Sequence, residues 1–423
     1  MRLLPNLLKN PISLCPGLIL VFFSIFLTVI MAGRPELQAV IEGNGLFTRQ
    51  LYQALSKGKG NVFFSPISAH AVLSMAYQGS GGTTREAFTK ALNVAGHQQA
   101  AEGYHDILNH LNNITGVQLL MANKIFVKEG QNFKPEFQAV TTKKFQSEVQ
   151  KLNFEKSAES AKIINDWVED KTQNKIKDLI EPGSLDASTR LVLVNAIYFK
   201  GTWANKFEVA DTKLEKFYLN DVDSIDVNMM NKRAKFFYKE DPELDAKVLE
   251  LPYTNPDVSL VIILPNKRNG IGELEKKLSG TDLTRITENM HKPEVILKLP
   301  KFKIETSIDL VDPLTQIGLG EIFTEKANFS NILDSPDQLY VSKAIQKAFI
   351  EVNEEGTEAA AATGMIMVMS ISIDPEDPVE FIADHPFLVL LKSRVSLVDE
   401  LRQARITIDG LPLFLGRVSQ PSQ

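Results

Sequence analysis

Histidine is the first residue type to search for chemistry, because it serves as general base, proton carrier and metal ligand. The six histidines are His70, His97, His105, His110, His291 and His385. None of them forms the His-x-x-x-His spacing that puts two metal ligands on one helical face. The sequence also lacks a Gly-x-Ser-x-Gly nucleophile elbow, a phosphate-binding loop and a His-Glu-x-x-His zinc motif. We therefore predict that the chain is not an enzyme and holds no metal and no cofactor.

The first residues of the chain are typical of a secretory signal. Arg2 and Lys9 precede an apolar run, Gly17–Ala32, which is shorter than the ~20 residues needed to span a bilayer. Small residues follow it, where a peptidase could cut. We predict a cleaved signal peptide over residues 1–32, secretion of the remaining chain to the extracellular space, and no membrane contact after cleavage. The alternatives are an uncleaved anchor and a cytoplasmic form translated from Met31.

Composition predicts one large globular unit without a nucleic-acid partner. Hydrophobic residues make up 44% of the 423 residues, enough for a sizeable core, and the net charge of -6 provides no basic surface for nucleic acid. Cys15, the only cysteine, lies within the predicted signal, so the secreted chain would contain neither disulfide nor thiol. No repeat or low-complexity linker divides the rest, and we predict a single domain over residues 33–423.

Helical spacing dominates the first half of the chain and strand patterns dominate the second. We predict helices over residues 36–57, 66–79, 85–93, 100–111, 133–145 and 158–173. The predicted strands are residues 61–64 and 189–199, the hairpin "KVLELPY" and "VSLVIILPN", and then "EVILKLPKFKIET", "KAFIEVNEE", "VEFIADHPFLVLL" and "LPLFLGRV". This order, with hairpins in place of alternating strand and helix units, predicts an α+β fold on mainly antiparallel sheets.

The stretch "EEGTEAAAATG", residues 354–364, has an unusual composition. On its own it favours a surface helix, because alanine and glutamate are strong helix formers. In an extended strand, however, alternate side chains share one face. Thr357, Ala359, Ala361 and Thr363 would then form a face of small side chains. Such a strand could enter a packed sheet without the ~1–3 kcal/mol that overpacking costs at each site.

Seven stretches of the chain, in order, resemble the serpin family, and the resemblance covers about residues 36–420. They are "NVFFSPISAHAVLSMAYQGSGGTT" (61–84), "INDWVEDKTQNKIKDLI" (164–180), "LVLVNAIYFKGTWANKF" (191–207), "LELPY" (249–253), "LPKFKIET" (299–306), "KAFIEVNEEGTEAAAATG" (347–364) and "DHPFLVLL" (384–391). The loop chemistry resembles insect members. The resemblance implies three β-sheets, eight to nine helices and an exposed reactive-centre loop, here residues 354–384.

In an inhibitory serpin the first part of this loop is a hinge, which inserts into a large central sheet after a protease has cut the loop. The resemblance assigns the hinge to Glu354, Glu355, Gly356, Thr357, Glu358, Ala359, Ala360, Ala361, Ala362 and Thr363. It also implies the mechanism: the protease forms an acyl-enzyme with the loop, and insertion traps this intermediate. The partner would therefore be a serine protease, held covalently by a protein that is a monomer before the complex forms.

The segment after the hinge predicts which protease is trapped. The family's usual spacing from Glu354 places the cut at Ser370–Ile371, whereas Met369–Ser370 is the better substrate for an apolar specificity pocket, and both bonds stay open. There is no Lys or Arg between Phe349 and Leu391, so a protease that requires a basic residue finds none. We predict a chymotrypsin-like or elastase-like target; a subtilisin-like enzyme is the alternative. A non-inhibitory serpin, acting as carrier or chaperone, is the competing function.

The resemblance assigns control of sheet opening to Ser65, Ser68 and Asn195 and places Trp203 beneath the start of the loop. Many serpins have a histidine where this chain has Gln346, an amide that can both donate and accept hydrogen bonds.

The remaining features are an insertion that departs from the family pattern and two sequons. Residues 392–410 are an atypical insertion where a short turn is expected, and we predict a surface loop with some helix or a segment that splicing removes. Sequons at Asn113 and Asn328 are possible glycosylation sites, and the second resembles a packed family motif.

Overall fold

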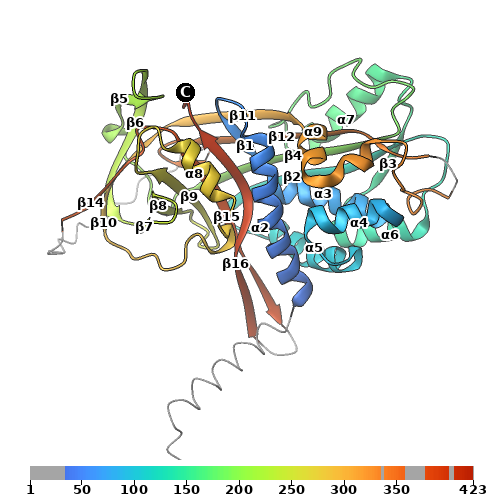
Figure 1. The fold of residues 1–423 in the computed structure, drawn as a ribbon, viewed down its shortest axis with the longest axis horizontal. Helices are drawn as coiled ribbons and strands as arrows, with labels where there is room; N and C mark the ends of the chain where they lie inside the picture. The colour runs from blue at the N-terminus through green and yellow to red at the C-terminus, as the bar shows by residue number, and fades with distance from the viewer. Residues whose placement is uncertain (1–33, 335–337, 358–376, 400–403, 423) are drawn as a thin grey trace, which may run out of the picture.

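The structure is a computed structural model, and it describes residues 34–334, 338–357, 377–399 and 404–422 (Figure 1). Eight α-helices and three β-sheets lie within these residues, so the predicted α+β fold with three mainly antiparallel sheets is confirmed. The helices are α2 (Pro35–Leu55), α3 (Pro66–Gly79), α4 (Gly82–Leu92), α5 (His97–Asn112), α6 (Pro135–Phe145), α7 (Ser157–Lys171), α8 (Ile271–Leu278) and α9 (Val311–Leu314). The predicted signal lies outside the described residues. No helix among the residues described is long and apolar enough to cross a membrane.

The central sheet has the strand order β11-β12-β13-β4-β2-β3. Its strands are β11 (Phe302–Asp309), β12 (Val341–Val352), β13 (Gly356–Thr357), β4 (Leu191–Thr202), β2 (Val117–Lys128) and β3 (Val149–Leu152). β12 and β4 pair in parallel, and the two-residue β13 is antiparallel to both. β4 is buried along almost its whole length because α3 covers one face of the sheet and α7 the other (Figure 1).

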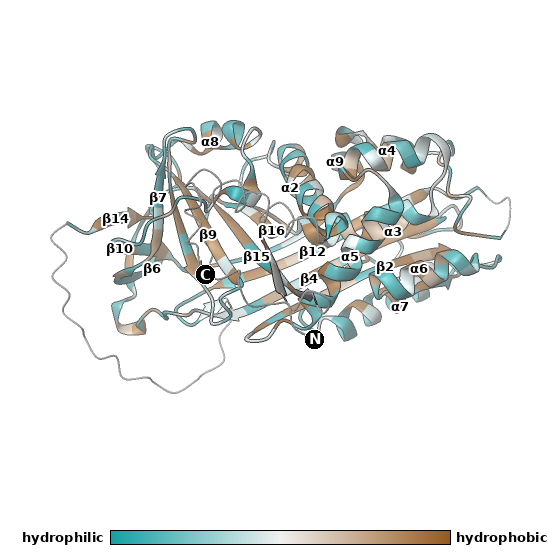
Figure 2. Ribbon diagram, turned by 90° about the horizontal axis from the view of Figure 1, so that it is seen from below, coloured by the Kyte–Doolittle hydropathy of each residue, from teal (hydrophilic) through white to brown (hydrophobic). Residues whose placement is uncertain are grey.

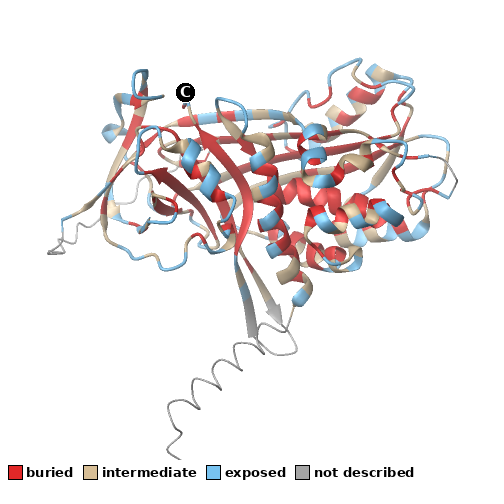
Figure 3. Ribbon diagram, viewed as in Figure 1, coloured by how far each residue is buried: buried red, intermediate tan, exposed pale blue. Residues whose placement is uncertain are grey.

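The second sheet is formed by strands of the C-terminal half and by β1. Its order is β1-β16-β15-β9-β8-β7, with β1 (Val62–Phe64), β16 (Ala404–Val418), β15 (Phe387–Asp399), β9 (Val258–Pro265), β8 (Ala246–Pro252) and β7 (Phe237–Asp241). β8, β9 and the adjoining parts of β15 and β16 are rich in apolar residues and largely buried (Figures 2 and 3), whereas only one of the five residues of the edge strand β7 is buried. β8 and β9 form the predicted hairpin.

The third sheet has four strands and contains the last residues of the predicted reactive-centre loop. Its order is β14-β10-β6-β5, with β14 (Val379–Ile382), β10 (Glu294–Pro300), β6 (Ser224–Lys235) and β5 (Lys213–Tyr218). A short helix, η1 (Val209–Asp211), leads into β5. The undescribed residues 358–376 therefore connect β13 of the central sheet to β14, an edge strand of this sheet.

The expectation of a loop with some helix at residues 392–410 is wrong for the described residues. β15 and β16 continue through the segment as an antiparallel hairpin that extends past the body of the second sheet (Figure 1). Val395 pairs with Ile408 and Leu397 with Ile406. The physical reason is the alternation of apolar and polar residues in "VSLV" and "ITI", which has the period of a strand.

Candidate functional site

A tight turn joins β12 to β13 and holds the first residues of the predicted hinge. The N–H of Gly356 donates to the carbonyl of Asn353 at 3.2 Å, and the N–H of Asn353 donates to the carbonyl of Gly356 at 2.9 Å. The Asn353 side chain accepts from the N–H of Glu355 at 3.1 Å. Glu354 and Glu355 are thus the two central residues of a hairpin turn, and the chain re-enters the central sheet directly after them.

Position 356 requires glycine for two reasons, its backbone conformation and the closeness of β4. Its φ is +149°, a conformation that side-chain-bearing residues rarely adopt, and a Cβ there would lie 2.0 Å from the carbonyl oxygen of Gly201. Gly356 and Thr357 pair with Thr202 and Gly201 of β4. The glycine therefore allows the two strands to approach closely at the point where the hinge begins.

Two lysines hold the glutamates of this turn. Glu354 is buried, forms an ion pair of 2.9 Å with Lys301, and accepts a hydrogen bond of 2.8 Å from the Thr212 hydroxyl. Burial raises the pKa of Glu354, but hydrogen bonds from Lys301, from its own backbone and from Thr212 outweigh burial and hold the pKa below its usual value. Glu355 forms an ion pair with Lys206. The turn is thus tied to the segment that leads into β5.

Trp203 lies under the turn. Its backbone N–H donates to the carbonyl of Glu355 and its indole Nε1–H to the carbonyl of Asn353, both at 2.9 Å. The indole stacks on Tyr253, with ring centroids 4.5 Å apart. The Tyr253 hydroxyl in turn bonds the Thr357 hydroxyl at 2.7 Å, and both residues are fully buried. Tyr253, which the sequence analysis missed, is therefore the direct partner of the hinge.

Between the hinge and the far end of the sheet, β12 and β4 are directly paired. The parallel register runs from Val341 opposite Leu191 to Phe349 opposite Tyr198. β13 lies between the two strands only beyond this stretch, at the end where the chain leaves β12. This seam is the place where a further strand could enter. Gly356 and Thr357 of the predicted hinge form β13 at the end of this seam.

A network of buried amides and hydroxyls crosses the middle of the seam. Gln346 stands opposite Asn195, and Asn195 stands opposite Asn123 on β2. The Gln346 amide donates to Asn195 Oδ1, and Asn195 Nδ2 donates to Asn123 Oδ1 at 2.5 Å. Three neighbouring strands are therefore connected through their side chains at one level of the sheet.

Residues at the start of α3 complete this network of hydrogen bonds. Ser65 caps the helix, and its backbone N–H and C=O both bond the Gln346 amide, at 2.8 and 2.9 Å. The Ser65 hydroxyl donates to the carbonyl of Leu413, and the Ser68 hydroxyl donates to Asn123 Oδ1, both at 2.7 Å. Gln346 thus satisfies donors and acceptors on both strand and helix. Asn123 was missed because one asparagine in an apolar strand gives no signal until the register is known.

The structure does not bring every predicted site residue together. Asn113 is exposed at the end of α5, and Asn328 is half-buried against the start of α4. Glu358, Ala359, Ala360, Ala361, Ala362, Thr363, Met369, Ser370 and Ile371 lie outside the described residues.

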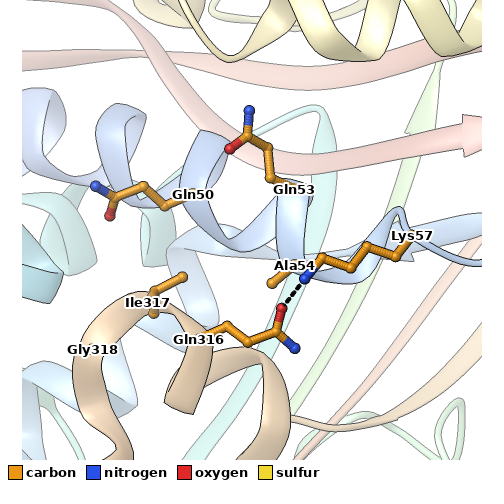
Figure 4. A pocket seen from close by; sticks show the side chains of 7 residues that line it. All are labelled: Gln50, Gln53, Ala54, Lys57, Gln316, Ile317 and Gly318. Carbon is orange, nitrogen blue, oxygen red and sulfur yellow. Dashed lines mark hydrogen bonds between the residues drawn. The ribbon is translucent and has the colours of Figure 1, made fainter.

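The hollow on the surface of α2 contains no residue of the seam. A hollow of about 520 Å³ lies between α2 and the segment Gln316–Gly318, with Lys57 bonded to Gln316 (Figure 4). Its polar lining consists of three glutamine side chains and Lys57, whose ammonium group is bonded to Gln316. No group of three or more histidine, cysteine and acidic residues that could hold a metal ion occurs within the described part of the chain.

Comparison with known proteins gives consistent matches. A family model described as Serpin (serine protease inhibitor) matches residues 42–421. Alaserpin from Manduca sexta is 40% identical over 397 residues, which cover 92% of this chain and 96% of that protein. The leukocyte elastase inhibitor from Sus scrofa is 38% identical over 392 residues, covering 89% and 98%. The crystal structure of Serpin48 from Tenebrio molitor superposes with a TM-score of 0.80 at 33% identity, covering 91% and 99%.

Proposed function

Because the chain belongs to the serpin family, as the resemblance of its motifs indicated, we propose that it is an irreversible inhibitor of extracellular serine proteases. The target protease attacks the reactive-centre loop and forms an acyl-enzyme. The cut loop then inserts into the central sheet between β12 and β4. Insertion distorts the attached protease before water releases it, so the inhibitor is consumed with its target.

The observation that carries this proposal is the position of β13. A strand that is to enter the seam must begin at the end where the chain leaves β12, and Thr357 is already paired there with Val352 of β12 and Gly201 of β4. Thr357 is fully buried. The next residues are one glutamate and four alanines, so the chain that follows adds little side-chain volume to a packed sheet.

The loop composition supports a protease with an apolar specificity pocket, and Met369–Ser370 and Ser370–Ile371 are the candidate bonds. One relative is named for leukocyte elastase. No basic residue lies between Phe349 and Leu391, so a protease whose pocket carries a carboxylate lacks its preferred partner. We further propose that residues 1–32 direct secretion, which would bring the inhibitor into contact with extracellular proteases.

The test is to incubate the purified protein separately with chymotrypsin, elastase and trypsin and to analyse denaturing gels and the cleavage products by mass spectrometry. We expect a band at the summed mass with the first two enzymes, and a cut after Met369 or Ser370. Thr357→Arg is the matched control, because a long cation cannot be accommodated at a buried position between β12 and β4. It should be cleaved at the same bond without forming a complex.

Two outcomes would contradict the proposal. If the unmodified protein is cleaved but no lane contains a covalent complex, the loop is only a substrate for these enzymes. A cut chain that is no more stable to heat than the intact chain would show that insertion does not occur, which favours the carrier or chaperone function.

A further inference from the structure

The two sequons of the chain lie in very different surroundings, although both have the same pattern. Asn113 follows the last residue of α5, is exposed, and donates from Nδ2 to the carbonyl of Asn109 at 2.7 Å. Thr115, the sequon's hydroxyl residue, is also exposed, and its carbonyl accepts a hydrogen bond of 2.6 Å from Asn255. An amide nitrogen with one hydrogen bonded to the helix end still has a second hydrogen, which a sugar can replace.

Asn328 is held by its neighbours. Its side-chain Oδ1 accepts from the N–H of Ser330 at 3.1 Å, and its backbone N–H donates to the Thr84 hydroxyl at 2.9 Å. Its amide nitrogen packs against the start of α4, where a Cβ on Gly81 would lie 3.2 Å from it. Phe329, the middle residue of this sequon, is 3% exposed. A glycan here would separate α4 from the segment that covers it.

A groove of about 330 Å³ lies directly beside Asn113. It is lined by the end of α5 with the segment from Asn113 to Thr115, by the connection between β8 and β9, and by Ser396 and Leu397 of the β15–β16 extension. The extension is fixed there by a hydrogen bond of 3.4 Å from the N–H of Ser396 to His110 Nδ1. The unusual insertion therefore creates the groove.

We propose that Asn113 carries an N-linked glycan and that its first N-acetylglucosamine lies in this groove. The groove combines apolar surface from Ile114 and Leu397 with the polar groups of Asn255 and Ser396, which suits a sugar ring that has a methyl group and several hydroxyls. In the transfer, a lipid-diphosphate-linked oligosaccharide is the co-reactant. The bond from Nδ2 to sugar C1 forms, the bond from C1 to the diphosphate oxygen breaks, and the amide loses one proton as the lipid diphosphate leaves.

The modification requires passage through the secretory pathway, which rests on the proposed signal. The first experiment therefore expresses the full chain in insect secretory cells twice, once with residues 1–32 and once with a proven signal in their place. N-glycosidase treatment and mass spectrometry should show one glycan, lost in Asn113→Gln and in Thr115→Ala and kept in Asn328→Gln. Thr115→Ala leaves the Asn113 side chain at the helix end intact, so its loss of glycan is not a folding defect.

The outcomes distinguish glycosylation of Asn113 from secretion by residues 1–32 and from protease inhibition. A glycan with the proven signal alone would show that Asn113 is competent and that residues 1–32 do not direct secretion. No glycan with the proven signal, or a glycan at Asn328, would overturn the assignment. Covalent complex formation with chymotrypsin is measured on the same samples, and it reports on the inhibitor function separately.

The position of the sugar is tested by hydrogen exchange. We expect slower exchange of the amides of Ser396 and Asp257 in the glycosylated protein than in Asn113→Gln, because the sugar covers their groove. Leu397→Ser should reduce this difference. Val222→Ser should not, because Val222 is an exposed aliphatic residue far along the chain from the groove. Equal exchange with and without the glycan would show that the sugar projects into solvent and that the groove does not hold it.

Discussion

The hydrogen bond between Tyr253 and Thr357 should determine how firmly the hinge is held in the central sheet. The two hydroxyls are 2.7 Å apart, and the residues are 1% and 0% exposed. Tyr253→Phe removes only one oxygen and keeps the stacking on Trp203. The buried Thr357 hydroxyl then loses its partner, which costs about 1 kcal/mol. Since 1.36 kcal/mol is a factor of ten, we expect the equilibrium for release of β13 to rise about fivefold.

Native-state hydrogen exchange measures this release. The N–H of Trp203 donates to the carbonyl of Glu355 in the hinge turn, so it is protected only while the turn is in place. Under conditions where closing is faster than exchange, its exchange rate is proportional to the opening equilibrium. Tyr253→Phe should therefore exchange about fivefold faster at Trp203, and Thr357→Val should behave similarly because it leaves the tyrosine hydroxyl unpaired.

The double variant is the critical control. Replacing both partners by apolar groups of the same shape leaves no buried group unsatisfied, so the double variant should exchange nearly as slowly as the unmodified protein. If the two single effects multiply in place of cancelling, the hydroxyls do not act on each other. An unchanged exchange rate in Tyr253→Phe would refute the role of this bond in holding the hinge.

Three further predictions concern the turn and the core. Gly356→Ala forces a Cβ to 2.0 Å from the Gly201 carbonyl, and the cost of about 2 kcal/mol should appear as more cleaved product and less covalent complex with chymotrypsin. Glu354→Gln should lower native stability by about 1 kcal/mol at pH 7, measured by urea unfolding. Because the pKa of Glu354 is lowered, this stabilisation is present above the usual pKa of 4.5, is lost as pH falls through the folded value, and the gap to Glu354→Gln should then close. Burial lowers the pKa of His70 to about 4, so stability should fall by up to about 3 kcal/mol as pH drops from 6.5 to 4, and His70→Gln should flatten that slope.

The periodicity of the sequence predicted elements whose burial is regular. β4 reads as an apolar run because both of its faces are covered, and α3 spans Pro66–Gly79, the residues predicted for this helix. The amide network could not be predicted in this way. Asn195 and Gln346 were found through the resemblance to a family, and Asn123 became visible only when β2 was seen in register with β4. Register between distant strands is a tertiary property that local patterns do not contain.

The hinge shows the same division between local and tertiary information. The small residues after Gly356 indicated a segment that can enter a sheet. The contacts that hold Glu354 come from Thr212 and Lys301, far away in sequence, and nothing in either segment indicates the pairing. The extension at 392–410 was misjudged for another reason: its strand period was present in the sequence, but the family's short turn at this place suggested a loop.

The register of β13 connects the hinge to the amide network. Thr357 stands opposite Gly201 on β4 and opposite Val352 on β12. Since both pairings are antiparallel, six further residues along the inserting strand move six residues back along each neighbour, from Gly201 to Asn195 and from Val352 to Gln346. If the strand continues in this register, Thr363 arrives between the two amides.

The proposed insertion would break the hydrogen bond from Gln346 to Asn195, because a strand would then separate β12 from β4. Residues opposite one another on neighbouring strands share a face, so the Thr363 side chain would point toward the same side of the sheet as these two amides. A hydroxyl can donate one hydrogen bond and accept others, and it could therefore replace the contact that is lost. On the proposed mechanism, the small residues before Thr363 would let the strand enter, and the polar residue at this position would satisfy the network once the strand has reached it.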